Sequence, residues 1–389
     1  MINSLSLRSN YKTLKKFTYL NQASLGLVSE KTATSMIEFL NEIAKHGNAQ
    51  MSDQDEVNFF QTLRNTCCRL FNCNSKNLAI LSSASELLNQ LPYLLDLKKG
   101  SKVVLVKSDF PALFRPWQAF SKKNKLKTHF VDENLNIDLT SSIIEIIDNE
   151  TVAVVVSYIQ YASGSKIDLK RLQKITKKLN IPFVIDVTQA AGAIPLDISK
   201  IECDAMVCSG YKWLGGHGGV AIAYLSDNLI NKTPLMPGWM GAKNPFNINN
   251  DKLDLAFGAK RYTQSTMSYI SLKSLNVSIK EILNLGIQNI ASHSEKLKKY
   301  LLSSLNKDKF KTLNGNEKLL SSHIISISNN EMDSTKITKI LFDNGIICSL
   351  RNGFIRISLA HYNDQTDIDK LLSVLDKSVS YTHLRAHET

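Results

Sequence analysis

Residues 203–225 read CDAMVCSGYKWLGGHGGVAIAYL, and this stretch indicates the type of fold that the chain adopts. Two short apolar runs, 205–209 and 219–225, have the length and composition of strands that are covered on both faces. Between them, Lys212 stands among aromatic and glycine residues. An unpaired lysine is costly to bury, so its ammonium group either reaches solvent or takes part in chemistry.

Similar apolar runs alternate with helical patterns upstream of this stretch. The pattern predicts strands over 78–82, 102–106, 152–158 and 182–186. It also predicts helices over 84–97 and 168–180, the second with Asp168 as its N-cap. Alternating strands and helices predict an α/β domain with a mainly parallel sheet. Ligands in such sheets gather at the carboxyl ends of the strands.

The pattern changes after about residue 255. A long helical stretch is expected over 266–302. Shorter elements follow, namely strands over 323–328 and 354–359, a helix near 334–344 and a last helix over 365–378 that ends near 377. These elements suit a smaller α+β domain.

We therefore expect two domains, which the length of 389 residues also favours. The large α/β domain is predicted over 18–255, and the small domain over 1–17 and 256–379. Residues 380–389 carry no apolar stripe and are expected to be either a non-native addition or a flexible tail.

Composition excludes several functional classes. The net charge is +12, but the lysines are dispersed, which argues against nucleic-acid binding and favours a general attraction for anionic metabolites. Neither a membrane-spanning run nor a signal-like N-terminus is seen, so a cytoplasmic location is expected. The six cysteines form neither a disulfide framework nor a metal-ligating CxxC pair, so no metal is predicted.

Three further features stand where the predicted sheet would place a ligand. Asp186 ends the strand 182–186 and points either into the ligand crevice or onto a following helix as its N-cap. Residues 82–85, SSAS, begin a predicted helix and offer either an anion site or a simple cap. Phe110 follows the strand 102–106 and is either a stacking residue or part of the core.

Together these groups match the needs of an aldehyde cofactor that carries a phosphate and a pyridine nitrogen. A lysine can hold such an aldehyde as a Schiff base. A carboxylate keeps the pyridine nitrogen protonated, so that the ring accepts electrons from the substrate. A helix N-terminus with hydroxyl groups holds the phosphate. The set therefore predicts pyridoxal 5′-phosphate (PLP) as cofactor.

The sequence resembles the class V aminotransferases, a family of fold-type-I PLP enzymes that includes cysteine desulfurases, kynureninase and isopenicillin-N-epimerase-like proteins. The resemblance runs along most of the chain. It rests on YLNQASLG (19–26), SSASELLN (82–89), SDFPALFRPW (108–117), the segment 185–225 and IRISLAHYN (355–363). It implies a large domain with a seven-stranded, mainly parallel sheet between helices, a small α+β domain and a homodimer.

The resemblance also implies roles for individual residues. Lys212 is the Schiff-base lysine and proton carrier, and Asp186 pairs with the pyridine nitrogen. Arg356 clamps the α-carboxylate of an amino-acid substrate, with a surface charge on an edge strand as the alternative. The remaining cofactor-binding positions are Ser83, Ala84 and Ser85 with Ser209 and Tyr211 for the phosphate, Phe110 for stacking on the ring, Gln189 for its phenolic oxygen, Thr266 for the phosphate of the partner subunit, and Tyr158, where the family often has Asn or His.

Departures from the family pattern narrow the function. Cysteine desulfurases need a nucleophilic cysteine on a loop before the substrate arginine, but Arg351 and Arg356 are separated by NGFI alone. Tyr158, Tyr211 and Trp239 favour the epimerase- and kynureninase-like branch. We expect an aminotransferase acting at the α-carbon of an amino acid. The alternatives are a lyase, epimerase or hydrolase of that branch, then a desulfurase, and finally a regulatory protein that binds the cofactor without catalysis.

Overall fold

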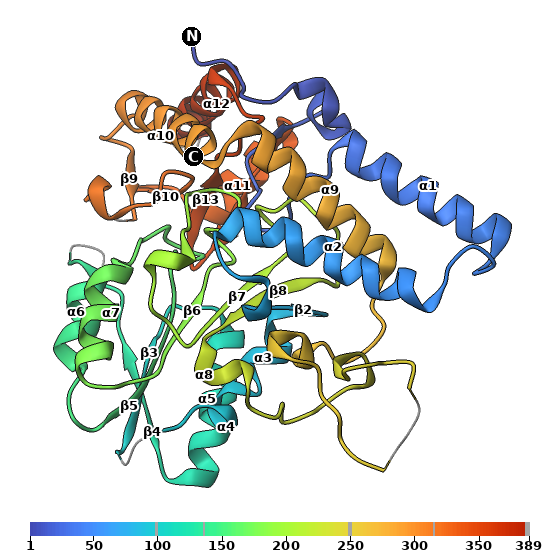
Figure 1. Ribbon diagram of the computed structural model, residues 1–389. Helices are drawn as coiled ribbons and strands as arrows, with labels where there is room; N and C mark the ends of the chain where they lie inside the picture. The colour runs from blue at the N-terminus through green and yellow to red at the C-terminus, as the bar shows by residue number, and fades with distance from the viewer. Residues whose placement is uncertain (98–99, 135–136, 248–250, 314–315, 386–389) are drawn as a thin grey trace.

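A seven-stranded sheet forms the centre of the molecule (Figure 1). The computed structural model describes residues 1–97, 100–134, 137–247, 251–313 and 316–385. The strand order is β2-β8-β7-β6-β5-β3-β4, and all neighbours are parallel except β8, which runs antiparallel to both β2 and β7. The strands are β2 (Leu78–Leu81), β3 (Lys102–Val106), β4 (Lys127–Val131), β5 (Thr151–Ser157), β6 (Phe183–Asp186), β7 (Ala205–Ser209) and β8 (Ala221–Leu225).

Two apolar cores cover the two faces of this sheet, because successive side chains of a strand point to opposite faces. In β2, for example, Ile80 packs into one core and Leu81 into the other. The first core includes α2 (Asp53–Phe71), α6 (Leu139–Ile146), α7 (Leu169–Lys178) and α9 (Tyr269–Leu285). The second includes α3 (Ala84–Leu88), α4 (Leu91–Leu94), α5 (Pro111–Asn124) and α8 (Asp227–Ile230). The predicted α/β architecture is confirmed.

A second, four-stranded antiparallel sheet has the order β12-β13-β10-β9. Its strands are β9 (Phe310–Thr312), β10 (Ile324–Asn329), β12 (Ser349–Arg351) and β13 (Phe354–Ser358). Helices α10 (Ile287–Ser304), α11 (Ser334–Asp343) and α12 (Gln365–Arg385) contribute to its core. Figure 1 shows these C-terminal elements grouped beyond one edge of the central sheet.

The N-terminal residues lie against the C-terminal part of the chain. Leu5 N donates to His361 O at 2.8 Å, and the Arg8 guanidinium pairs with Asp367 at 2.6 Å. Strand β1 (Thr18–Tyr19) pairs in parallel with β11 (Ile346–Ile347), and α1 (Glu30–His46) follows. These contacts accord with assigning residues 1–17 to the small domain. The domain limits themselves remain a prediction.

Three predicted elements differ from the structure, and one strand was not predicted. The expected helix over 84–97 is two short helices, α3 and α4, because Pro92 lacks the N–H that a continuous helix needs. The stretch 266–302 is broken between α9 and α10 at Gly286, whose φ is 81°. Strand β4 was not predicted. Helix α12 continues past residue 377 to Arg385, and residues 378–385 include neither proline nor glycine to end it.

The segment 19–26 reaches the backbone of Lys212. Gly26 N donates to Tyr211 O at 2.9 Å, and the Gln22 side chain donates to Lys212 O at 3.0 Å. A Cβ atom on Gly26 would lie 2.0 Å from Lys212 O, far inside van der Waals contact. This close approach requires glycine and couples the beginning of the chain to the lysine turn.

Replacing Gly26 by alanine should therefore destabilise the protein. The added methyl group collides with backbone rather than with a flexible side chain, so we expect a loss of about 1–3 kcal/mol in the free energy of unfolding. Urea unfolding measures the loss. Gly218→Ala is the matched control, since its Cβ would meet nothing within 4 Å. Equal unfolding midpoints for the two variants would contradict the contact.

Candidate active site

Lys212 lies just after β7, and its side chain is buried, with 8% of the residue exposed. Within the described part of the chain, its Nζ makes neither a hydrogen bond nor an ion pair. The ring centroids of Phe110 and Tyr211 lie 5.4 and 5.9 Å from Nζ. Burial lowers the pKa of Lys212 to about 8. This value includes an opposing effect of the Asp186 charge and smaller lowering effects of the positive charges of Arg356 and Arg351.

Asp186 ends β6, the strand next to β7, so its carboxyl group stands at the same edge of the sheet as Lys212. Its Oδ1 accepts a hydrogen bond from Thr188 N at 2.7 Å. Residues 188–193 form turns and not a helix, so Asp186 makes a cap-type hydrogen bond two residues on but does not cap a helix. Burial raises the pKa of Asp186, and both the Thr188 hydrogen bond and the Lys212 charge oppose that rise.

The side chain of Gln189 makes two hydrogen bonds within the protein. Its Nε2 donates to Ala23 O at 3.1 Å, and its Oε1 accepts from Trp213 Nε1 at 2.7 Å. One N–H of the side-chain amide remains for another acceptor, because an amide carries two. Gln189 can therefore donate a hydrogen bond to a ligand.

The predicted phosphate-binding residues come from two adjoining elements. Helix α3 packs against β7, which brings Ser83 and Ser85 toward the strand that ends at Ser209. Ser83 is the exposed N-cap residue and makes no side-chain capping bond, whereas Ala84 is buried. The first N–H groups of α3 have no acceptor inside the helix, so this edge presents donors together with the half-buried Tyr211.

Phe110 is not a core residue. It is 44% exposed and stands at the N-cap of α5, where its ring meets Tyr161 edge-on at 5.7 Å. Since the Phe110 ring also lies beside Lys212 Nζ, its aromatic face is available to a ligand at the lysine. The geometry therefore agrees with Phe110 as a stacking residue and not as a core residue.

Asp109 is a buried residue that the sequence argument missed. Its carboxylate accepts hydrogen bonds from Ser157 N at 2.8 Å, from Ser157 Oγ at 2.5 Å and from Phe110 N at 2.7 Å. Burial raises the pKa of Asp109 to about 6, against these hydrogen bonds. Asp109 therefore ties the ends of β3 and β5 together and fixes Phe110. Its place just after an apolar strand, like that of Asp186, was the available signal.

Tyr158 contributes to this region through its backbone. Its N–H donates to Asp186 O at 2.9 Å. The centroid of its ring lies 5.9 Å from Lys166 Nζ. The residue lines a cavity of about 770 Å³ together with Lys298 and Ser321, and Lys212 is not among the lining residues of that cavity. The neighbouring Ser157 points the other way, to Asp109. The alternation of side chains along β5 thus separates the two residues.

Arg356 lies in β13, an inner strand of the small sheet, and is 1% exposed, so the surface-charge alternative is wrong. Its Nη1 donates to Tyr161 O at 2.8 Å and its Nη2 to Ser24 Oγ. Arg351 Nη2 donates to the same Ser24 oxygen at 3.0 Å. Burial, followed by repulsion from Arg351, lowers the pKa of Arg356 to about 9. Ser24 and Arg351 were not expected at the site.

Thr266 lies apart from these groups in the described chain. It is exposed, in the turn before α9, and its neighbour Ser265 accepts a hydrogen bond from Trp239 Nε1 at 3.3 Å. Its predicted role concerns the site of a partner subunit, so its position on the surface is compatible with that role.

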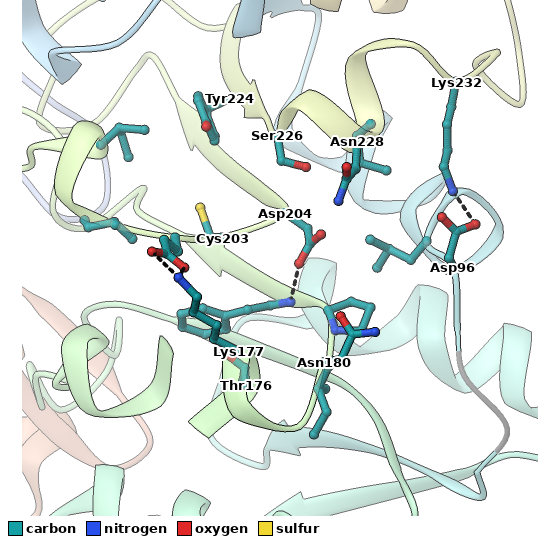
Figure 2. A pocket seen from close by; sticks show the side chains of 18 of the residues that line it. Asp96, Thr176, Lys177, Asn180, Cys203, Asp204, Tyr224, Ser226, Asn228 and Lys232 are labelled. Carbon is teal, nitrogen blue, oxygen red and sulfur yellow. Dashed lines mark hydrogen bonds and ion pairs between the residues drawn. The ribbon is translucent and has the colours of Figure 1, made fainter. Parts of the chain in front are cut away.

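Another cavity, of about 620 Å³, lies at the opposite edge of the sheet, near the beginning of β6 and β7 (Figure 2). Its charged groups already have partners. Lys232 pairs with Asp96 at 2.5 Å, and Asp204 accepts from Phe183 N at 2.8 Å. An unpaired buried amine is the stronger indicator of chemistry, so we place the candidate site at Lys212.

Among the described residues, no cluster of histidine, cysteine and acidic side chains could hold a metal ion. In the same part of the chain, no helix combines the length and apolar character needed to cross a membrane.

The donor set suits a cofactor with an aldehyde, a pyridine nitrogen and a phosphate. Lys212 offers an amine that loses its proton more easily than an ordinary lysine, and Asp186 offers a buried carboxylate. Phe110 offers an aromatic face, and α3 and Ser209 offer donors. The fold and this site define an α/β enzyme of the PLP-dependent class.

Comparisons with known proteins identify the family. The family model for class-V aminotransferases matches residues 18–371, so the chain belongs to that family. PLP is the cofactor of the family, which confirms the cofactor expected from the sequence.

The relatives carry the names of different activities. The chain is 22% identical to a probable cysteine desulfurase of Mycoplasma genitalium, over 97% of each chain. It is 24% identical to an uncharacterised aminotransferase of Bacillus subtilis, YcbU, over 74% of this chain and 75% of the other. Among solved structures, a mutant of the protein C-DES with glycine covalently linked to its PLP cofactor has a TM-score of 0.86, at 18% identity, over 95% and 98%.

The lowered pKa of Lys212 can be measured directly in cofactor-free protein. Trinitrobenzenesulfonate reacts with neutral amines, so labelling of Lys212, followed by peptide mass analysis, should rise with pH with a midpoint near 8. Arg356→Gln removes a positive charge and should move the midpoint upward. Arg69→Gln, on the exposed face of α2, should leave it unchanged. A wild-type midpoint near the usual value of about 10.4 would show that the amine is hydrated.

Proposed function

We propose that the protein is a PLP-dependent aminotransferase that moves the amino group of an α-amino acid, with Lys212 as its proton carrier. The observation that carries the proposal is the buried Lys212 amine, whose pKa falls to about 8 and which lies beside Phe110. An amine that loses its proton near neutral pH can both take and return one.

The residues that would hold the cofactor are those described around Lys212. When bound, PLP supplies an aldehyde for covalent capture of an amine and a ring that accepts electrons. Asp186 would keep the ring nitrogen protonated, and Gln189 would donate to the phenolic oxygen. Ser83, Ala84, Ser85, Ser209 and Tyr211 would bind the phosphate, and Tyr158 would contribute through its backbone. Arg356 would orient the substrate carboxylate with a planar guanidinium.

Transamination is favoured over desulfuration because of the β12–β13 hairpin. Asn352 and Gly353 alone join the two strands, and both have positive φ, which forms a tight turn with no room for a cysteine loop. Cys348 precedes the hairpin, and burial raises its pKa to about 12. A thiol of that pKa is a poor nucleophile at neutral pH. Cysteine desulfuration remains the second candidate, because relatives carry that name.

Transamination is also favoured over epimerisation. An epimerase must return the α-proton on the other face of the substrate, so it needs an acid–base group on each side. The Phe110 ring, which lies beside Lys212 Nζ and would stack on the cofactor, carries no exchangeable proton. One amine that moves a proton on one face suffices for transamination.

We further propose a cytoplasmic homodimer. The six cysteines are free thiols, as is usual in a reducing compartment. Trp239 is 42% exposed and Phe257 74% exposed, and they lie on the loops that precede Thr266. An exposed apolar surface of this kind favours association, and a second subunit there would bring Thr266 to the partner's phosphate site.

Lys212→Ala should abolish both the visible absorbance band of the bound cofactor and amino-group transfer, because it removes the buried amine beside Phe110. Asp186→Asn should retain a band but lower kcat roughly 100- to 1,000-fold, since a charge that stabilises the transition state is lost. Absorbance spectra and keto-acid assays measure both. Lys122→Ala, an exposed lysine on α5, is the control. A visible band that persists without Lys212 would refute the assignment.

The reaction type can be tested with a panel of amino acids and mass analysis of products. Keto acid formed together with a new amino acid from an added keto-acid acceptor would support transfer. Sulfide from cysteine that disappears in Cys348→Ala would contradict it and favour desulfuration. Loss of optical activity without keto acid would favour epimerisation instead.

A further inference from the structure

A pair of adjacent guanidinium groups distinguishes the substrate side of this site. In the β12–β13 ladder Arg351 lies opposite Phe354, and Arg356 lies two residues further along β13. Residues opposite each other, and residues two apart on one strand, share a face of the sheet. Both arginines therefore project from the same face, and both donate to one oxygen, Ser24 Oγ.

This pair has no acidic counterpart among the described residues. The recorded partners of Arg356 are the Tyr161 carbonyl and the Ser24 hydroxyl, and those of Arg351 are the Leu350 carbonyl and the same hydroxyl. Arg356 Nε is buried without any hydrogen-bond partner. Two cations so close together repel each other, and the buried one, Arg356, lacks the acidic partner that buried charges normally have.

A single α-carboxylate carries one negative charge, so it balances one guanidinium and leaves the pair with a net positive charge. Arg356 is nearly fully buried and suits the α-carboxylate, whereas Arg351 is partly exposed at the end of β12 and stands next to it. A second anionic group on the same substrate would pair with Arg351, which a neutral side chain cannot do. Arginine forms bidentate hydrogen bonds with planar carboxylates, so the geometry of each guanidinium group matches one carboxylate.

We propose that the substrate is an amino acid with an acidic side chain, and that Arg351 is the residue that recognises its second carboxylate. The proposal rests on the proposed function, because it assigns the substrate of that same site. Ser24 is the positioning residue. Its hydroxyl holds both guanidinium groups side by side until the two carboxylates replace it.

The test uses cofactor-loaded protein and two unreactive probes, succinate with two carboxylates and butyrate with one, measured by isothermal titration calorimetry. Wild type should bind succinate roughly 10- to 100-fold more tightly than butyrate, as expected for one further charge-assisted pair. Arg351→Gln should remove this preference and leave butyrate affinity nearly unchanged. Arg351→Lys, which keeps the positive charge, should retain part of the preference for succinate. Arg69→Gln is the matched control and should bind both probes like wild type.

Two results would overturn the proposal. One is equal binding of succinate and butyrate by wild type. The other is an equal loss of affinity for both probes in Arg351→Gln, because both arginines would then hold a single carboxylate.

Failure of the proposed function gives a different pattern. If succinate preference depends on Arg351 but no amino acid yields a keto acid, the acidic-ligand site stands and transamination is refuted. With transamination intact, L-aspartate or L-glutamate should yield keto acid with a lower KM than L-alanine. Arg351→Gln should then raise KM for the acidic substrate and leave that for L-alanine unchanged.

Discussion

Desolvation of the Lys212 amine is the constraint on which the rest of the site depends. A pKa that falls from 10.5 to about 8 means that the charged form is disfavoured by on the order of 3 kcal/mol. The free energy of unfolding is lowered by this full amount below pH 8. The loss disappears as the pH rises toward 10.5, the ordinary pKa of lysine, because the unfolded chain keeps the proton up to that pH. The fold keeps the lysine in place through its backbone. Gln22 and Gly26 hold the lysine turn from one side, and Gly192 packs against Trp213 O from the other.

The central sheet could be predicted almost completely because most of its strands are buried on both faces. Such strands appear as continuous apolar runs, and β3 and β7 begin and end where the runs do. Strand β4 was not predicted because it is an edge strand in which exposed residues alternate with partly buried ones, KTHFV (127–131). Helix limits were less predictable, since the apolar period continues across Pro92 and Gly286 although the backbone cannot.

The predictable part of the site consists of residues at strand ends. Asp186, Ser209 and Lys212 follow apolar runs directly, so their edge of the sheet could be inferred from local pattern. Ser24 and Arg351 could not be found in this way. Their contact joins residues 327 positions apart, and it depends on how the small sheet docks against the segment 19–26. The Tyr158 ring shows the same limit, because one step along β5 turns a side chain to the opposite face.

Charge balance connects the lysine to the arginine pair. Lys212, Arg351 and Arg356 form a cationic group in which the two guanidinium charges both help to lower the pKa of the lysine. An anion bound between the arginines would cancel part of this effect and raise the pKa of Lys212. In the proposed reaction, binding of an acidic substrate would thereby make the Lys212 amine more basic for removal of the α-proton. The acidity of the ligand and the reactivity of the lysine are thus two consequences of one electrostatic arrangement.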